Sequence, residues 1–134
     1  MYKWGARMEP LTNEIPLCDI SSQNLAYVGD GIYELMVRER LVRGSGRVRG
    51  LHKLAVEQVR AEAQAKAADR LLPLLNEKEA AVYRRGRNAH TARTDGAYHK
   101  ATGLEALFGY LYLSGETARL HVLFDEAMSA IEET

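Results

Sequence analysis

Apolar side chains recur every three or four residues along most of the chain after residue 20, which is the spacing of amphipathic helices. Ser21 or Ser22 can cap a first long helix, and Gly44 and Gly46 end it. The apolar positions of this helix are Leu25, Val28, Ile32, Leu35, Met36 and Leu41. A basic loop over residues 45–49 follows it. We therefore predict a helix from about residue 22 to the low forties.

A second helix is predicted from about residue 50 to 72, because the segment is rich in Ala, Gln, Glu and Arg, which are good helix formers. Pro73 stops or kinks it. The residues expected on its buried face are Leu51, Leu54, Ala55, Val59 and Ala65. The segment Asn76–Glu79 then has the spacing of a capping box, which predicts a short helix to about Arg85.

Two more helices are predicted, over about 98–114 and 116–132. The second of them carries one apolar face, formed by Leu120, Leu123, Phe124, Ala127 and Ile131. Residues 86–97 contain turn formers and no periodicity, so they predict a long loop of the kind that often carries function. No stretch alternates apolar and polar residues with a period of two, and the pattern as a whole therefore predicts an all-α fold.

Length and composition are those of an ordinary globular chain. The 134 residues suggest one domain, over 21–134, after a lead-in over 1–20. Lys+Arg and Asp+Glu are both 18, so the chain is not a globally basic nucleic-acid binder. The lone Cys18 excludes an intramolecular disulfide and fits a reducing cytoplasm. We expect a cytoplasmic protein without a signal peptide or a membrane span.

Asp30 does not fit the pattern of apolar residues in the first predicted helix. It lies in LAYVGDGIY, flanked by Gly29 and Gly31, and each of these three residues is a poor helix former. Local conflicts of this kind concentrate at functional sites. The glycines would let another backbone or a ligand approach closely.

Glu105 is the second anomaly, as the only charge between Lys100 and Glu116 in an otherwise apolar helix. Such a carboxylate must face solvent, meet a cation or stay protonated. Gly103 and Gly109 would again allow close approach, so we expect this helix to pack on the first one with Asp30 and Glu105 facing one cleft. Two carboxylates with waters suit Mg²⁺, which supports phosphodiester hydrolysis.

Two structural alternatives stay open at this point. Asp30 could cap a break in its helix, and Glu105 could pair with an arginine. Glu34 lies one turn after Asp30, but a salt bridge to Arg38 is the preferred interpretation. The histidines do not have the spacing of metal ligands, and we interpret them as surface or RNA-contact groups.

Basic residues gather in two segments although the net charge is zero. Residues 38–53 and 84–100 carry several arginines and lysines against a single acid each, Glu39 and Asp95. Side chains of this kind suit phosphate and 2′-hydroxyl contacts, and the scarcity of aromatics favours a duplex backbone over a single strand. A solvated basic face is the alternative.

These motifs resemble a known family. LAYVGDGIYE is similar to the signature helix of the ribonuclease III catalytic domain, and GLEALFGYLYL to that family's second acidic helix. LHK at 51–53 and YRRGRNAH at 83–90 resemble the Mini-III ribonucleases, short bacterial members without a separate double-stranded-RNA-binding domain. The resemblance covers about residues 21–130.

The resemblance implies a helical bundle like the ribonuclease III endonuclease domain and a symmetric homodimer with its signature helices near the two-fold axis. It implies an Mg²⁺-dependent endoribonuclease that cuts double-stranded RNA and leaves 5′-phosphate and 3′-hydroxyl ends. The implied substrate is precursor large-subunit (23S) ribosomal RNA, and a ribosomal protein on that precursor is a possible partner.

The resemblance also implies roles for individual residues. Asp30 and Glu105 would be catalytic and hold the Mg²⁺. The wider family has further acids at the positions of Gln23, Ala26 and Thr102. Gln23 and Thr102 are expected to orient waters of the metal. The residues expected to contact RNA are His52, Lys53, Arg85, Arg87, Asn88, His90 and Arg93.

The missing acids leave room for two other classes of function. A catalytically silent relative would bind structured RNA in a ribonucleoprotein through the same dimer. An unrelated helical interaction module would use Asp30 and Glu105 only in salt bridges.

Overall fold

The computed structural model describes residues 16–44, 48–89 and 96–133, and every regular element within them is helical. The all-α prediction is therefore confirmed. In chain order the elements are η1 (Leu17–Asp19), α1 (Ser22–Arg43), α2 (Val48–Val59), α3 (Ala61–Leu71), η2 (Leu72–Leu74), α4 (Glu77–Arg87), α5 (Gly96–Leu113) and α6 (Thr117–Glu132).

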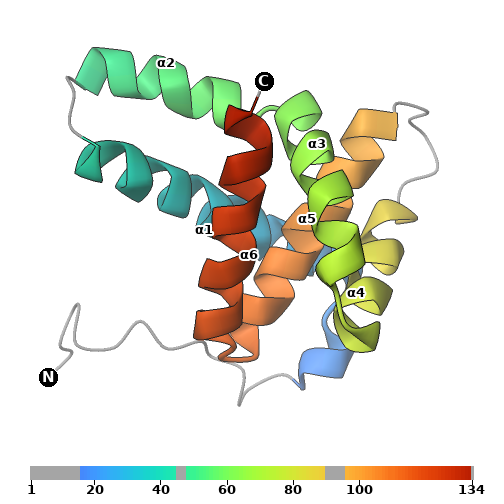
Figure 1. Ribbon diagram of the computed structural model, residues 1–134. Coiled ribbons are helices and arrows are strands. Elements are labelled where there is room, and N and C mark those ends of the chain that lie inside the picture. The colour runs from blue at the N-terminus through green and yellow to red at the C-terminus, as the bar shows by residue number, and fades with distance from the viewer. Residues whose placement is uncertain (1–15, 45–47, 90–95, 134) are drawn as a thin grey trace, which may run out of the picture.

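Helix α5 is the centre of the bundle, and α1, α3, α4 and α6 all pack against it (Figure 1). Its sequence explains this position, because Glu105 is the only charged residue between Lys100 and its end. A helix that is apolar on nearly every side must be covered on nearly every side. Helix α2 instead packs on α1 and lies at the edge of the bundle.

Two groups of buried side chains surround α5. The larger group lies among α1, α3, α5 and α6, and the Tyr33 ring packs edge-on against Phe108 and Phe124 at centroid distances of 5.5 and 5.9 Å. The smaller group joins the start of α1 to α4 and α5 and consists of Leu25, Ala26, Val82 and Ala106. Burial of each large apolar side chain contributes about 1.5–3 kcal/mol to folding, so these contacts fix how α1 crosses α5.

Local signals set both ends of α1 as predicted. The backbone N–H of Asn24 donates to the Ser21 Oγ at 3.1 Å, which makes Ser21 the N-cap, and Gly44 is the C-cap. Leu35 is one of the apolar positions that recur at helical spacing, yet its side chain is 55% exposed. The buried residues that the pattern missed in α1 include Tyr33 and Val37.

The single helix predicted over about 50–72 is wrong, because the chain breaks at Arg60 into α2 and α3. Arg60 has an extended backbone, with φ −70° and ψ 160°. Side chains from elsewhere satisfy the carbonyls at the end of α2, since the Tyr33 hydroxyl donates to the Gln58 oxygen and the Gln64 amide to the Val59 oxygen. Leu54 was expected on the buried face, but it is 45% exposed.

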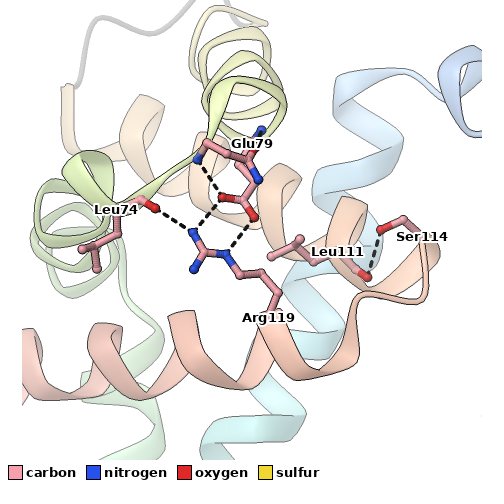
Figure 2. Close-up of polar contacts among 6 residues, drawn as sticks. Leu74, Glu79, Leu111, Ser114 and Arg119 are labelled. Atoms are coloured by element: carbon pink, nitrogen blue, oxygen red, sulfur yellow. Dashed lines mark hydrogen bonds and ion pairs between the residues drawn. The ribbon is translucent and has the colours of Figure 1, made fainter.

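Helix α4 begins with the predicted capping box, in which Asn76 and Glu79 exchange hydrogen bonds of 2.9 Å. The Glu79 carboxylate also accepts two hydrogen bonds of 2.9 Å from the Arg119 guanidinium of α6, which reaches the Leu74 carbonyl as well (Figure 2). This ion pair ties the starts of α4 and α6 together. As predicted, α3 ends before Pro73.

The last two helices follow their predicted bounds within two residues. Gly115 has a φ of 78°, a conformation that favours glycine, and it makes the turn between α5 and α6. The predicted apolar face of α6 is buried at Leu120, Leu123, Phe124 and Ala127 and half-buried at Ile131.

Candidate active site

Helices α1 and α5 cross at two glycines, as their sequences predicted. A Cβ on Gly29 would overlap the carbonyl oxygen of Glu105, and a Cβ on Gly109 would overlap the carbonyl oxygen of Leu25. The two backbones therefore touch directly, which only glycine permits. Gly31 differs, since a Cβ there would meet nothing within 4 Å. Its glycine is not needed for packing within the described parts of this chain.

The crossing brings Asp30 of α1 and Glu105 of α5 together, and their side chains share a hydrogen bond. Asp30 is exposed, whereas Glu105 is half-buried. Burial is the largest of the causes that together raise the pKa of the Glu105 carboxyl from its ordinary 4.5 to about 8; the negative charge of Asp30 and the hydrogen bond to it act in the same direction. The surroundings of Glu105 therefore favour its protonated form more than water favours that of a free carboxyl.

Neither structural alternative for the acids holds among the residues that the structure describes. Helix α1 runs without a break through Asp30, so this residue is no cap. Glu105 makes no ion pair with an arginine among the described residues, and its polar contacts are Asp30 and Gln64. The predicted bridge between Glu34 and Arg38 is confirmed, at 2.9 Å.

Two further side chains surround Glu105 from other elements. Tyr33 is fully buried, and its burial and the charge of Glu105 both raise the pKa of its hydroxyl. Gln64 of α3 is 1% exposed, and its amide donates a hydrogen bond to Glu105, which acts to lower the pKa of that carboxyl. The sequence analysis missed Gln64, whose only signal is one amide in the alanine-rich segment AEAQAKAA.

The donor set fits a hard cation such as Mg²⁺. Two carboxylates lie against each other with no cation beside them in the described residues, and the buried Oε1 of Gln64 has no hydrogen-bond partner there. Oxygen ligands, a net negative charge and room for water are what Mg²⁺ requires, since it keeps several waters and few protein ligands. Asp30 and Glu105 are the residues that would hold it.

Gln23 and Thr102 lie on the same two helices as the acids. Gln23 is exposed in the first turn of α1, two turns before Asp30. Thr102 is buried one turn before Glu105, and its hydroxyl donates to the Tyr98 carbonyl at 3.0 Å. That proton is therefore committed to the helix backbone, although the Thr102 oxygen can still accept a hydrogen bond.

The basic end of α4 lies beside the same turn of α5. A Cβ on Gly86 would meet Ala106 and the backbone of Gly103, so this end of α4 touches the turn that carries Glu105. The neighbouring side chains of Arg85, Arg87 and Asn88 are exposed. The structure thus brings three of the predicted RNA-contact residues to the helix that holds Glu105.

The other predicted RNA-contact residues are not in that group. His52 and Lys53 are exposed on α2, which lies on the opposite side of the bundle from α4 (Figure 1). His90 and Arg93 lie outside the described residues. Within one chain, His52 and Lys53 therefore do not share a surface with the end of α4.

Other features of the described residues lie apart from the acids. A cavity of about 670 Å³ is bounded by α1, α2 and α6, and its lining includes Arg40, His121 and Asp125. Groups of three or more His, Cys, Asp or Glu side chains arranged for a metal are absent from the described ranges. In the same ranges, none of the helices is both long and apolar enough to span a membrane.

Comparison with known proteins gives a consistent result. Residues 23–116 match the family described as "Ribonuclease III domain". The chain is 50% identical over 114 residues to the Mini-ribonuclease 3 of Symbiobacterium thermophilum, covering 81% of this chain and 88% of that protein. It is 42% identical over 131 residues to the Mini-ribonuclease 3 of a Thermoanaerobacter species, covering 93% and 92%.

A solved structure shares the arrangement of helices. The crystal structure of a Fusobacterium nucleatum protein superposes with a TM-score of 0.76 at 26% identity, covering 83% of this chain and 93% of that one. The matched family segment contains both Asp30 and Glu105.

Proposed function

The chain belongs to the ribonuclease III family, in its Mini-ribonuclease 3 group, and from that premise we propose that this endoribonuclease uses Mg²⁺ at Asp30 and Glu105 to cut double-stranded RNA. The observation that carries the proposal is the acidic pair itself. The carboxyl groups of Asp30 and Glu105 lie in contact at the crossing of α1 and α5, with no basic side chain to neutralise them in the described residues. An arrangement that is costly without a cation is explained by binding one.

The two acids divide the work according to their surroundings. Glu105 is fixed by the α1–α5 crossing and by the Gln64 amide, whereas Asp30 is exposed and can reach a substrate phosphate region. The bound ion supplies Lewis-acid chemistry, which activates water and stabilises negative charge on the phosphodiester. Asp30 and Glu105 would hold the ion as carboxylates.

The basic end of α4 is the proposed path of the RNA. Arg85, Arg87 and Asn88 would contact phosphates and 2′-hydroxyl groups, and His90 and Arg93 are proposed to extend this path. His52 and Lys53 are proposed to add contacts from α2. Because only the shallow minor groove of an RNA duplex is open to such a site, selectivity comes from duplex shape more than from base identity.

We also propose a homodimer, in which α1 lies near the two-fold axis. The support is a stripe of exposed apolar residues on one side of α1, in which members follow each other at intervals of four or seven residues. Its members Tyr27, Leu35 and Val42 are 84%, 55% and 64% exposed, and Gly31 has open space where a side chain would be. Two copies would place two sites along one duplex, each cutting one strand to leave 5′-phosphate and 3′-hydroxyl ends.

The proposed substrate is precursor 23S ribosomal RNA, met in the cytoplasm, with a ribosomal protein on the precursor as a possible partner. The resemblance to the Mini-III ribonucleases supports these proposals. Residues 21–134 are proposed to form the single catalytic domain, with Gln23 and Thr102 orienting waters near the acids.

The test is cleavage of a long RNA duplex by the full chain in Mg²⁺. The parallel samples contain EDTA, the Asp30→Asn variant, or single-stranded RNA of the same sequence. We expect duplex-specific cutting that EDTA and Asp30→Asn both abolish. A precursor 23S rRNA fragment with and without ribosomal proteins then tests the substrate.

Metal-independent cutting, or cutting by Asp30→Asn at the wild-type rate, contradicts the site. Binding of the duplex without any cutting, on the naked and the protein-bound precursor alike, favours the catalytically silent RNA binder instead.

A further inference from the structure

Among the residues that the structure describes, Gln64 is the buried amide that contacts the acidic pair. It lies in the first turn of α3, surrounded by alanines, with an exposed fraction of 1%. Small apolar residues occupy neighbouring positions of this helix, so packing alone does not require a polar side chain here. A buried amide in such a place needs partners for both of its ends.

The nitrogen end of the amide is fully used. Nε2 donates at 2.9 Å to the carbonyl of Val59, the last residue of α2, and it also donates to the Glu105 carboxylate. The first bond exists because the chain breaks at Arg60 and leaves the Val59 carbonyl without a helical partner. The α2–α3 break thus anchors the amide, and the anchored amide restrains Glu105.

The oxygen end of the amide is unused. The Gln64 Oε1 is buried and accepts no hydrogen bond from the residues that the structure describes. An unsatisfied buried acceptor costs about 1–3 kcal/mol. If Gln64 served only to cap the end of α2, its hydrogen bond to the Val59 carbonyl would be explained. That role explains neither its hydrogen bond to Glu105 nor the position of its Oε1 beside two acids.

We propose that Gln64 is a positioning residue of the acidic site, which holds the Glu105 carboxylate in the orientation that binds the cation together with Asp30. Its Oε1 accepts a hydrogen bond from a water held beside the two acids. This inference rests on the proposed metal-dependent function and adds a third element, α3, to a site otherwise formed by α1 and α5. Residues that orient a ligating carboxylate typically change metal affinity about 10- to 100-fold when they are replaced.

The test compares Gln64→Met with the wild-type protein. Methionine keeps the length of the side chain and removes both donors and the acceptor. Mg²⁺ affinity is measured by titration calorimetry on the RNA-free protein, and kcat and KM are measured on duplex RNA. We expect the Kd for Mg²⁺ to rise about tenfold or more and kcat at limiting Mg²⁺ to fall in proportion. KM for RNA should stay within about twofold, since Gln64 is buried away from the RNA path.

Gln58→Met is the matched control, because Gln58 also buries an Oε1 without a partner in the described residues and lies two residues before the same break. It should keep the wild-type affinity for Mg²⁺. Gln64→Asn, which keeps the amide but withdraws it by one methylene, should lose affinity as Gln64→Met does. It provides the answer if the methionine variant does not fold.

The outcomes separate this inference from the proposed function. Suppose that Asp30→Asn loses Mg²⁺ binding while every Gln64 variant that folds keeps the wild-type affinity for Mg²⁺. The role of Gln64 is then overturned, and the metal site stands. If the wild-type protein binds no Mg²⁺ through Asp30, the proposed function and this inference fall together. A KM that rises with no change in Mg²⁺ affinity assigns Gln64 to packing and also overturns the inference.

Discussion

Two glutamates, Glu79, which is buried, and Glu105, which is half-buried, have opposite surroundings in this molecule. Glu79 is 3% exposed and receives the Arg119 guanidinium and the Asn76 N–H, and these hydrogen bonds lower the pKa of its carboxyl (Figure 2). Glu105 is also withdrawn from water, but it meets another acid, and its pKa rises to about 8. Glu79 therefore has its cationic partner within the chain, whereas Glu105 has no positive partner among the described residues.

The partners of the two side chains, rather than their burial, distinguish Glu79, which is structural, from Glu105, which we propose to be functional. Glu79 ties α4 to α6 and needs nothing from outside. Glu105 is stabilised only when a proton or a cation arrives, which is the state expected of a metal ligand in the absence of its metal.

The largest expected effect is on cleavage. Glu105→Gln should reduce cleavage by at least about a thousandfold, as the loss of an essential catalytic group does, because it removes a carboxylate that binds the cation. The same variant should be at least as stable as the wild-type protein in EDTA, since the amide cannot repel Asp30. Duplex cleavage and urea unfolding on one preparation check both halves, and a wild-type rate would show that Glu105 is no ligand.

Arg119→Met should have the reverse profile. It leaves the Glu79 carboxylate buried without its cation, which should lower the free energy of unfolding by about 2–4 kcal/mol, toward the lower part of the range for buried pairs because the Arg119 side chain is 32% exposed. Cleavage per folded molecule should be unchanged. Urea unfolding and initial rates at a temperature well below the transition measure the two effects, and a loss of rate without a loss of stability would refute the assignment.

Glu105 and Glu79 should also give opposite pH dependences of the free energy of unfolding in EDTA. The folded-state pKa of Glu105 is raised, so its contribution is fully present below about 4.5 and is lost as the pH rises toward about 8, at up to about 1.4 kcal/mol per pH unit. The folded-state pKa of Glu79 is lowered, so its contribution is present above about 4.5 and is lost as the pH falls.

Urea unfolding at a series of pH values checks this prediction with two variants. Glu105→Gln should reduce the decline of the free energy of unfolding between pH 4.5 and 8 and leave its change below pH 4.5 as in the wild-type protein. Arg119→Met should flatten the loss of stability on the acid side alone. If the free energy of unfolding of Glu105→Gln still declines between pH 4.5 and 8 as in the wild-type protein, the decline belongs to another group.

The smallest expected effect lies outside both glutamates. Arg87→Ala, at the exposed end of α4, should weaken duplex binding several-fold and reduce the salt-dependence slope by about one unit, as the loss of one phosphate contact does. Stability and Mg²⁺ affinity should stay at their wild-type values. Duplex binding by fluorescence anisotropy at several salt concentrations checks it, and Lys66→Ala, on the exposed side of α3, is a charge-matched control.

Signals that act within a few residues could be interpreted from the sequence. Ser21 as the cap of α1, Pro73 after α3 and the Asn76–Glu79 capping box all set helix ends where they were predicted. Asp30 and Glu105 stood out because a charge in a glycine-bearing apolar helix conflicts with its neighbours in the chain. The crossing of their helices followed from glycine spacing, since close backbone approach requires the absence of a Cβ.

Tertiary contacts decided the remainder. The break at Arg60 carries no Gly or Pro, and it is satisfied by Tyr33 from α1 and Gln64 from α3, partners that no local pattern reveals. The exposure of Leu35 depends on which side of α1 its neighbours leave open. Helical periodicity tells which residues share a face, but only the packing of distant segments determines what that face meets. For the same reason the sequence singled out both acids, while the fold supplied the amide that holds one of them.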